Sequence, residues 1–190
     1  KDLVLYMPFD TANAKEVNET SVNLSGLVGL WHFNNETGEN DSFIKDFSVD
    51  INPERAGKVH NNGTCSLEGG TCPTYNSSRK KLGAFAVGFD GREVGYEVAY
   101  DNSLNITTLT ILAWIYPDDL STERMILDKR NQFSFRIQSS TKTLTYYDGT
   151  AVFTDDGPSP ELNQWSHVGM TLADGTVTFY LNGVLQSSKA

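Results

Sequence analysis

Two cysteines and a nearby histidine are the first residues whose types and spacing could do chemistry. Cys65 and Cys72 enclose a six-residue segment that contains Gly69 and Gly70, so the chain can turn back and bring the two sulfurs together. The alternative is a metal pair assisted by His60, but the spacing is wider than that of a zinc knuckle and no second cysteine pair exists. We therefore predict a local disulfide, which is typical of an oxidising compartment.

Asparagines followed two positions later by Ser or Thr form the second chemical pattern, because such sequons accept N-linked glycans. Roughly three sequons would arise by chance from this Asn, Ser and Thr content. The sequons begin at Asn18, Asn23, Asn35, Asn40, Asn62, Asn76 and Asn105. This excess predicts a secreted glycoprotein that lies outside the cell or on its surface.

The charge balance and the apolar runs exclude two classes of partner. The net charge is -9, and Arg79, Lys80 and Lys81 form the only basic run, so nucleic-acid binding is not expected. No apolar run approaches the roughly 20 residues needed to span a bilayer, so we expect no membrane insertion by this segment. Neither a signal peptide nor an initiator Met is present, which is expected of a processed or excised segment. Acidic loops suit calcium, although a solvated acidic surface explains them equally.

Alternating apolar and polar positions separated by turn residues predict an all-β fold. Asp174-Gly175 and Asn182-Gly183 favour the positive φ angles of type I′ hairpin turns, so they are the firmest local predictions. Long polar loops are expected at 34–56 and 64–82. The predicted strands cover 27–33, 58–63, 84–89, 94–99, 109–116, 125–128, 133–138, 142–147, 164–172, 176–181 and 184–187.

Five sequence blocks, taken in order, resemble the laminin G-like family of the concanavalin A-like superfamily. The blocks are Gly26-Leu-Val-Gly-Leu-Trp-His-Phe33, Gly83-Ala-Phe-Ala-Val-Gly-Phe-Asp-Gly91, Ser103 to Pro117, Asn163-Gln-Trp-Ser-His-Val168 and Val177-Thr-Phe-Tyr-Leu-Asn-Gly-Val184. The resemblance implies a two-sheet antiparallel jelly-roll sandwich. It also implies that glycans or protein partners are bound, often with one calcium ion. Four loop carboxylates are the candidate calcium ligands, each equally explicable as a turn former or a solvated group: Asp46, Asp50, Asp90 and Asp101.

Large aromatic residues are expected to fill the core or the rim of this sandwich, in preference to forming a sugar-stacking platform. The residues concerned are Trp31, Phe89, Trp114, Trp165 and Phe179, and we expect Trp114 and Phe179 to share one interior. His167 stands between Trp165 and Val168 in a predicted strand, so it is interpreted as a structural histidine.

A non-enzymatic protein is predicted, because the catalytic patterns searched for are incomplete or missing. Glucan hydrolases of the superfamily carry E-x-D-x-x-E on one strand, where two carboxylates can flank the glycosidic bond. Here Glu39 and Asp41 begin that pattern, but Ile44 stands where the second Glu is needed. Missing motifs alone leave sialidase-like and lyase chemistry open.

The N-terminal residues 1–25 are predicted to be an extension that carries a spare strand, whereas 26–190 form the sandwich. Residues 3–10 repeat the apolar pattern of residues 27–34 at a constant offset, and the family normally continues with strands beyond the last hairpin. The missing strands would leave an open sheet edge. The strand could fold back or complete a neighbouring copy; as an assembly strand, its residues are Leu3, Val4, Leu5, Tyr6, Met7 and Phe9. A third alternative is that 1–25 ends a preceding repeat.

The sequence therefore predicts an extracellular recognition or adhesion module that binds glycans or cell-surface proteins. The rival hypothesis is a structural subunit of an extracellular filament, assembled by donor-strand exchange of residues 3–10.

Overall fold

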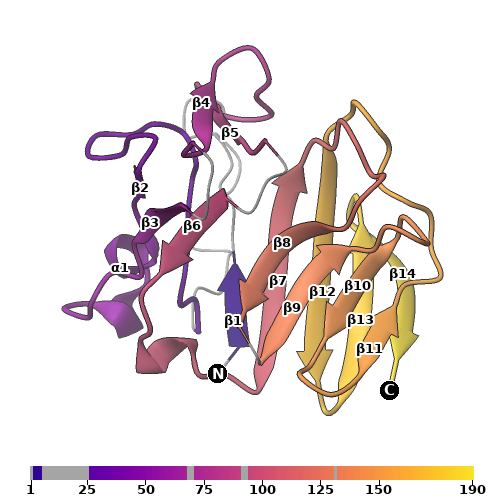
Figure 1. Ribbon diagram of the computed structural model, residues 1–190. Coiled ribbons are helices and arrows are strands. Elements are labelled where there is room, and N and C mark those ends of the chain that lie inside the picture. Colours follow the sequence, from indigo (N-terminus) through magenta and orange to yellow (C-terminus); the bar gives the residue numbers. More distant parts are fainter. Residues whose placement is uncertain (1, 6–25, 68–70, 91–93, 131) are drawn as a thin grey trace. The chain divides into compact units, whose positions relative to one another are not determined.

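The computed structural model describes residues 2–5, 26–67, 71–90, 94–130 and 132–190, and nearly every regular element in them is a strand (Figure 1). The chain divides into two compact units, Lys1–Ile106 and Thr107–Ala190. Every strand pairing within either unit is antiparallel, which confirms the predicted all-β, jelly-roll type of fold. Within the described residues, no helix combines the length and apolar character that crossing a membrane requires.

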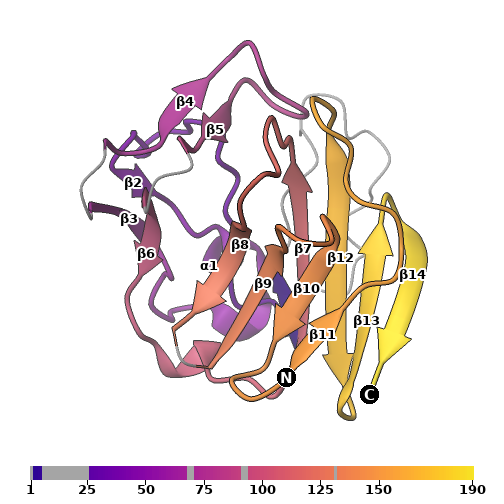
Figure 2. The ribbon, with the colours of Figure 1, turned by 45° about the vertical axis from the view of Figure 1, so that its right-hand side comes forward.

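The C-terminal unit consists of two antiparallel sheets that lie against each other as two layers (Figures 1 and 2). One sheet contains β7, β12, β13 and β14 in that order, and the other contains β11, β10, β9 and β8. The strands are β7 Thr108–Ile115, β8 Arg124–Lys129, β9 Phe133–Ile137, β10 Leu144–Tyr147, β11 Val152–Thr154, β12 Ser166–Ala173, β13 Thr176–Leu181 and β14 Val184–Lys189. The predicted meander and hairpins are confirmed.

The core of this unit is formed by side chains that alternate along the facing strands. Phe135 and Tyr146 from one sheet are buried, as are Ile111, Met170 and Phe179 from the other. Each of these five large side chains is at most 2% exposed. Burying one such side chain contributes about 1.5–3 kcal/mol, so this interior supplies most of the driving force for folding the unit.

The two Gly-containing turns adopt the conformation that their sequences predict. Asp174 and Gly175 have φ angles of 49° and 75°, and Asn182 and Gly183 have φ angles of 52° and 77°. Two successive positive φ angles match the right-handed twist of the flanking strands. The turns thereby set the register of β12 to β13 and of β13 to β14.

The expectation that Trp114 and Phe179 share an interior is wrong. Phe179 pairs with Met170, which pairs in turn with Ile111, and all three are buried. Trp114 pairs with His167, and its ring packs against the His167 ring at 5.1 Å. Neighbouring residues of a strand point to opposite faces, so a shift by an odd number of positions moves a side chain out of the core.

The N-terminal unit contains shorter elements. They are β1 Asp2–Leu5, β2 Phe43–Ile44, α1 Ser48–Ile51, η2 Pro53–Arg55, β3 Gly63–Leu67, β4 Thr74–Asn76, β5 Ala86–Gly88, β6 Val94–Val98 and η3 Asn102–Leu104. A three-stranded sheet has the order β2, β3 and β6, and β4 pairs with β5. Leu27, Leu30 and Trp31 are buried in this unit, and the Trp31 indole Nε1 donates to the Asn61 carbonyl at 2.8 Å.

Three sequence predictions for this unit need correction. Residues 27–33 form isolated bridges, such as Trp31 with Asp46, in place of a strand. The strand predicted at 58–63 begins at Gly63, and the loops predicted at 34–56 and 64–82 contain β2, α1, η2 and β4. Phe89, which was expected in the core or the rim, is 54% exposed. Side-chain hydrogen bonds position these segments. Because such bonds leave no trace in the spacing of apolar residues, the sequence pattern did not predict them.

The predicted boundary between an extension 1–25 and a domain 26–190 stays a prediction. Of the assembly strand, Leu3, Val4 and Leu5 lie in β1, whereas Tyr6, Met7 and Phe9 lie outside the described residues, as do Asn18 and Asn23. Donor-strand exchange therefore also stays a prediction.

Candidate functional site

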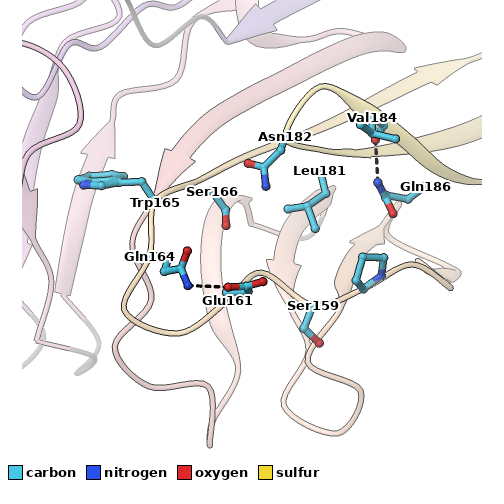
Figure 3. A pocket seen from close by; sticks show the side chains of 10 residues that line it. Ser159, Glu161, Gln164, Trp165, Ser166, Leu181, Asn182, Val184 and Gln186 are labelled. Carbon is cyan, nitrogen blue, oxygen red and sulfur yellow. Dashed lines mark hydrogen bonds between the residues drawn. The ribbon is translucent and has the colours of Figure 1, made fainter.

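A pocket of about 390 Å³ lies in the C-terminal unit, next to the hairpin between β13 and β14 (Figure 3). Its volume falls within the roughly 300–1,000 Å³ range of small-molecule sites. We call it the C-terminal pocket. It is lined by Pro158, Ser159, Glu161, Gln164, Trp165, Ser166, Leu181, Asn182, Val184 and Gln186.

Three segments bring these residues together: the loop before β12, the beginning of β12 and the β13–β14 hairpin. The hairpin turn is fastened to β12 through Asn182, whose backbone N–H donates to the His167 carbonyl at 2.7 Å. The Asn182 side-chain Oδ1 accepts from the His167 N–H at 2.9 Å. Since Oδ1 is used in this way, the Nδ2 group of Asn182 remains as a donor at the pocket wall.

The pocket combines aromatic and aliphatic surface with amide groups. Figure 3 shows Trp165 at one end, Val184 and Gln186 at the other, and Leu181 between them. The half-buried Trp165 packs edge-to-face against Tyr116, with 5.6 Å between the ring centroids, which restrains its indole. Val184 is 62% exposed, so the pocket also offers apolar surface to solvent.

Two hydrogen bonds orient the amides of the pocket. Gln164 Nε2 donates to Glu161 Oε2 at 2.6 Å, and Gln186 Nε2 donates to the Val184 carbonyl at 2.9 Å. Each amide keeps an oxygen acceptor and a second N–H donor. A ligand with many hydroxyl groups, each of which both donates and accepts, could satisfy such a set.

A buried carboxyl group, Asp155, lies behind the wall of the pocket. Asp155 is 3% exposed, and its Oδ1 accepts from the Ser187 hydroxyl at 2.6 Å and from the Gly157 N–H at 3.1 Å. Within the described residues, Asp155 Oδ2 has no hydrogen-bond partner. A Cβ at position 157 would lie 3.0 Å from Asp155 Oδ2 and 2.6 Å from Gln186 Oε1, so only glycine leaves this space open.

Asp46, a predicted calcium ligand, is instead the buried hub of the N-terminal unit. It is 0% exposed, and its Oδ1 accepts from the N–H groups of Leu30 and Ser48 at 3.0 and 2.8 Å. Its Oδ2 accepts from the Ser48 hydroxyl at 2.9 Å and from the Asn61 N–H at 2.8 Å. These four bonds hold together segments far apart in the sequence, and they occupy the oxygens that a metal would need.

The other predicted calcium ligands are engaged separately. Asp50 pairs with Lys45 at 2.9 Å. Asp101 Oδ1 accepts from the Ser103 N–H at 2.8 Å. Hydrogen bonding from the Ser103 side chain, and secondly from this N–H, lowers the pKa of Asp101. Asp90 is exposed. Across the part of the chain that the structure describes, no three His, Cys, Asp or Glu side chains form a group that could hold a metal. The four carboxylates do not fit a shared site, and calcium binding stays a prediction.

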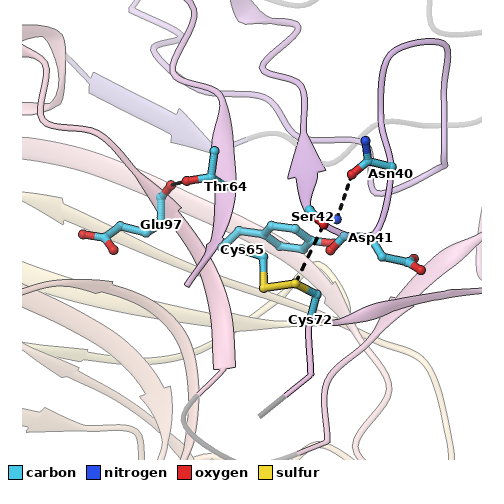
Figure 4. The surroundings of a disulfide bond; sticks show 8 residues. Asn40, Asp41, Ser42, Thr64, Cys65, Cys72 and Glu97 are labelled. Carbon is cyan, nitrogen blue, oxygen red and sulfur yellow. Dashed lines mark hydrogen bonds between the residues drawn. A yellow bond between two sulfur atoms is a disulfide. The ribbon is translucent and has the colours of Figure 1, made fainter. Parts of the chain in front are cut away.

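The predicted disulfide between Cys65 and Cys72 is confirmed, with 5.7 Å between the Cα atoms, so the zinc alternative is wrong (Figure 4). The bond ties β3 to the segment before β4. Both cysteines contact Ser42: the Cys65 N–H donates to the Ser42 carbonyl at 2.8 Å, and the Ser42 hydroxyl lies 3.9 Å from Cys72 Sγ. His60 donates from Nδ1 to the Asp46 carbonyl at 2.8 Å.

The partial hydrolase pattern is structural. Glu39 is 8% exposed, and its two carboxylate oxygens accept from the N–H groups of Glu36 and Lys45 at 2.9 and 3.1 Å. Asp41 accepts from the Tyr75 N–H at 3.0 Å, and Ile44 is buried in β2. Burial raises the pKa of Tyr75, an effect to which the charge of Glu39 adds. Glu39 and Asp41 thus anchor loops of the N-terminal unit through backbone N–H groups.

The described sequon asparagines differ in accessibility. Asn35, Asn40, Asn76 and Asn105 are exposed. Asn62 is half-buried, and its Oδ1 accepts from the Asp46 N–H at 2.8 Å.

Sequence reasoning missed most of the C-terminal pocket. It singled out Trp165 for the core or rim, and Asn182 only as a turn former. The available signal was the polar segment from Pro158 to Trp165, which places an amide and a carboxylate directly before a tryptophan and a strand. Convergence of this segment with the β13–β14 hairpin depends on strand pairing and is not visible in the spacing.

The fold defines a β-sandwich protein with a pocket at the hairpin end of one sheet. The family model Laminin_G_3, described as the concanavalin A-like lectin/glucanases superfamily, matches residues 90–190. The chain belongs to this superfamily.

A solved structure of a proposed carbohydrate binding protein from Bacteroides ovatus ATCC 8483 is also similar, with 20% identity and a TM-score of 0.38. The similarity covers 43% of this chain and 25% of that protein, so it carries no argument about function. The search of curated proteins found no match.

Proposed function

We propose that this chain is a non-enzymatic carbohydrate-binding module that binds glycans in the C-terminal pocket. The observation that carries the proposal is the composition of the pocket, whose lining includes Trp165 together with the amides of Gln164, Asn182 and Gln186. Sugar rings have apolar C–H faces that pack on aromatic rings, and they have hydroxyl edges that pair with amides. Membership of a superfamily that includes lectins supports this choice.

We further propose that the module acts outside the cell in adhesion or recognition. The Cys65–Cys72 disulfide supports this, because such bonds persist in oxidising compartments. The four exposed sequon asparagines of the described residues are consistent with passage through a secretory pathway.

A glycan array followed by calorimetry on the best neutral ligand tests the proposal. We expect Trp165→Ala and Gln164→Ala each to weaken binding by about tenfold or more, because each removes a contact at the pocket wall. Tyr100→Ala is the matched control, since Tyr100 is an aromatic residue that is 70% exposed and does not line the pocket. Equal affinities for the Trp165 variant and the wild type would contradict the proposal, as would release of sugar products.

A further inference from the structure

Glu161 is the one acidic or basic side chain among the ten that line the C-terminal pocket. Glu161 is exposed, and its Oε2 holds the Gln164 amide at 2.6 Å. The remaining polar groups of the lining are amides and hydroxyls. A bound ligand therefore meets a negative charge with no positive charge on the pocket wall.

The charged groups near the pocket do not cancel the negative charge at its wall. The Asp155 carboxyl lies close to Gly157, because a Cβ at that position would meet both Asp155 Oδ2 and Gln186 Oε1. Lys189 is the last residue of β14, and its ammonium group pairs with the Asp156 carboxylate. The whole chain carries a net charge of -9, so the more distant field is also negative.

We infer that the C-terminal pocket selects uncharged glycans and discriminates against sialylated, uronate-containing or sulfated ones, with Glu161 as the discriminating residue. The inference rests on the proposed glycan-binding function. Proteins recognise carboxylates and sulfates with Arg or Lys, which form charge-assisted hydrogen bonds, and this pocket presents none. Neutral hydroxyl and acetamido groups match the three amides, because both partners donate and accept.

The expected size of the discrimination follows from the charge repulsion. Repulsion between two like charges about 6 Å apart lowers affinity by roughly 100-fold at the effective dielectric of a protein surface and by about threefold in bulk water, so for the exposed Glu161 we expect an intermediate effect of about tenfold. This repulsion is screened by salt, because the Debye length falls from about 30 Å at 0.01 M to about 3 Å at 1 M. Binding of a neutral glycan, in contrast, should depend little on salt.

The test compares one neutral oligosaccharide with the same oligosaccharide bearing a terminal sialic acid, by calorimetry at low and high salt. We expect the wild type to bind the neutral form about tenfold more tightly at low salt. This ratio of the two affinities, which we call the affinity gap, should become smaller at high salt. Glu161→Gln should reduce the affinity gap, because the acidic form should bind more tightly to this variant. Glu161→Lys should reduce the affinity gap further.

Glu123→Gln is the matched control, because Glu123 pairs with Arg136 and lies outside the pocket lining. It changes the net charge equally and should leave the discrimination unchanged. Equal or tighter binding of the acidic form by the wild type would overturn the selectivity while leaving the glycan-binding function intact. The selectivity would also be overturned if Glu161→Gln and Glu123→Gln changed the ratio of the two affinities equally. Failure of the wild type to bind either form would reject the proposed function itself.

Discussion

Arg55 and Asp46 meet in the interior of the N-terminal unit, with 3.7 Å between Arg55 Nη2 and Asp46 Oδ2. Their side chains are 6% and 0% exposed. Arg55 also donates from Nη2 to the Val59 carbonyl at 2.8 Å, and Asp46 accepts four further hydrogen bonds. The Asp46 carboxylate is thus well supplied with hydrogen bonds, whereas Arg55 Nε has no hydrogen-bond partner within the described residues. Each buried charge therefore depends on the other as its counter-charge.

Asp46→Asn should lower the free energy of unfolding by about 3–5 kcal/mol, because it leaves the Arg55 charge buried without a counter-charge. Urea unfolding followed by tryptophan fluorescence measures the loss. Asp50→Asn is the matched control, since Asp50 forms a partly exposed pair with Lys45 and should cost about 1 kcal/mol or less. Equal losses in the two variants would contradict the assignment of Asp46 as the hub. A decrease in the melting temperature of the wild type on addition of EDTA would support the calcium prediction.

Gly157→Ala should weaken glycan binding by several-fold. Its Cβ would lie 2.6 Å from Gln186 Oε1 and 2.8 Å from Gln186 Cβ, so this pocket residue must move. Such overpacking typically costs about 1–3 kcal/mol. Calorimetry with the best neutral ligand, combined with thermal unfolding, separates the effect on binding from that on stability. Gly95→Ala is the control, because nothing lies within 4 Å of a Cβ placed at position 95. Unchanged affinity in the Gly157 variant would contradict a role of the Gln186 side chain in binding the glycan.

His167 should make the stability of the protein fall as the pH decreases below about 7. Burial lowers the pKa of His167 below its usual 6.5, so the unfolded chain binds a proton more readily than the folded chain. Stability is therefore greatest above about pH 6.5 and declines as the pH falls toward the folded pKa. Urea titrations at pH 7.5 and 5.5 should show a smaller decline for His167→Gln than for the wild type. Parallel declines would show that other groups cause the pH dependence.

Removal of the Cys65–Cys72 disulfide should destabilise the N-terminal unit. Closing a loop of seven-residue separation contributes about 2.5 kcal/mol in the chain-entropy treatment. The Cys65→Ser, Cys72→Ser double variant should show this loss in urea, whereas the affinity of the C-terminal pocket for a neutral glycan should persist. A double variant as stable as the wild type would contradict a stabilising role for the bond.

Glycan occupancy should follow the accessibility of the sequon asparagines. In a eukaryotic secretory host, we expect modification at the four exposed sites, Asn35, Asn40, Asn76 and Asn105. We expect little modification at Asn62, because its side chain is held by the Asp46 N–H. Glycopeptide mass spectrometry measures each site, and high occupancy at Asn62 would show that the Asp46 hub opens during synthesis.

Features that depend on local physics could be predicted from the amino-acid sequence alone. The Asp174-Gly175 and Asn182-Gly183 turns require positive φ angles that few other residues adopt, so their hairpins were predictable. The disulfide followed from the glycine-bearing loop between Cys65 and Cys72, and alternation of apolar residues identified the strands of the C-terminal unit.

The face that each strand presents, and the distant residues that meet, became known from the three-dimensional structure. The sequence left the face of Trp114 open, because a strand with apolar residues on both sides does not reveal which side is buried. Asp46 looked like any other loop aspartate until its hydrogen bonds to Leu30 and Asn61 showed a buried hub. Glu161 and Gln186 line one pocket because strand pairing brings a loop and a hairpin together across about 25 residues, and spacing along the chain does not encode that distance.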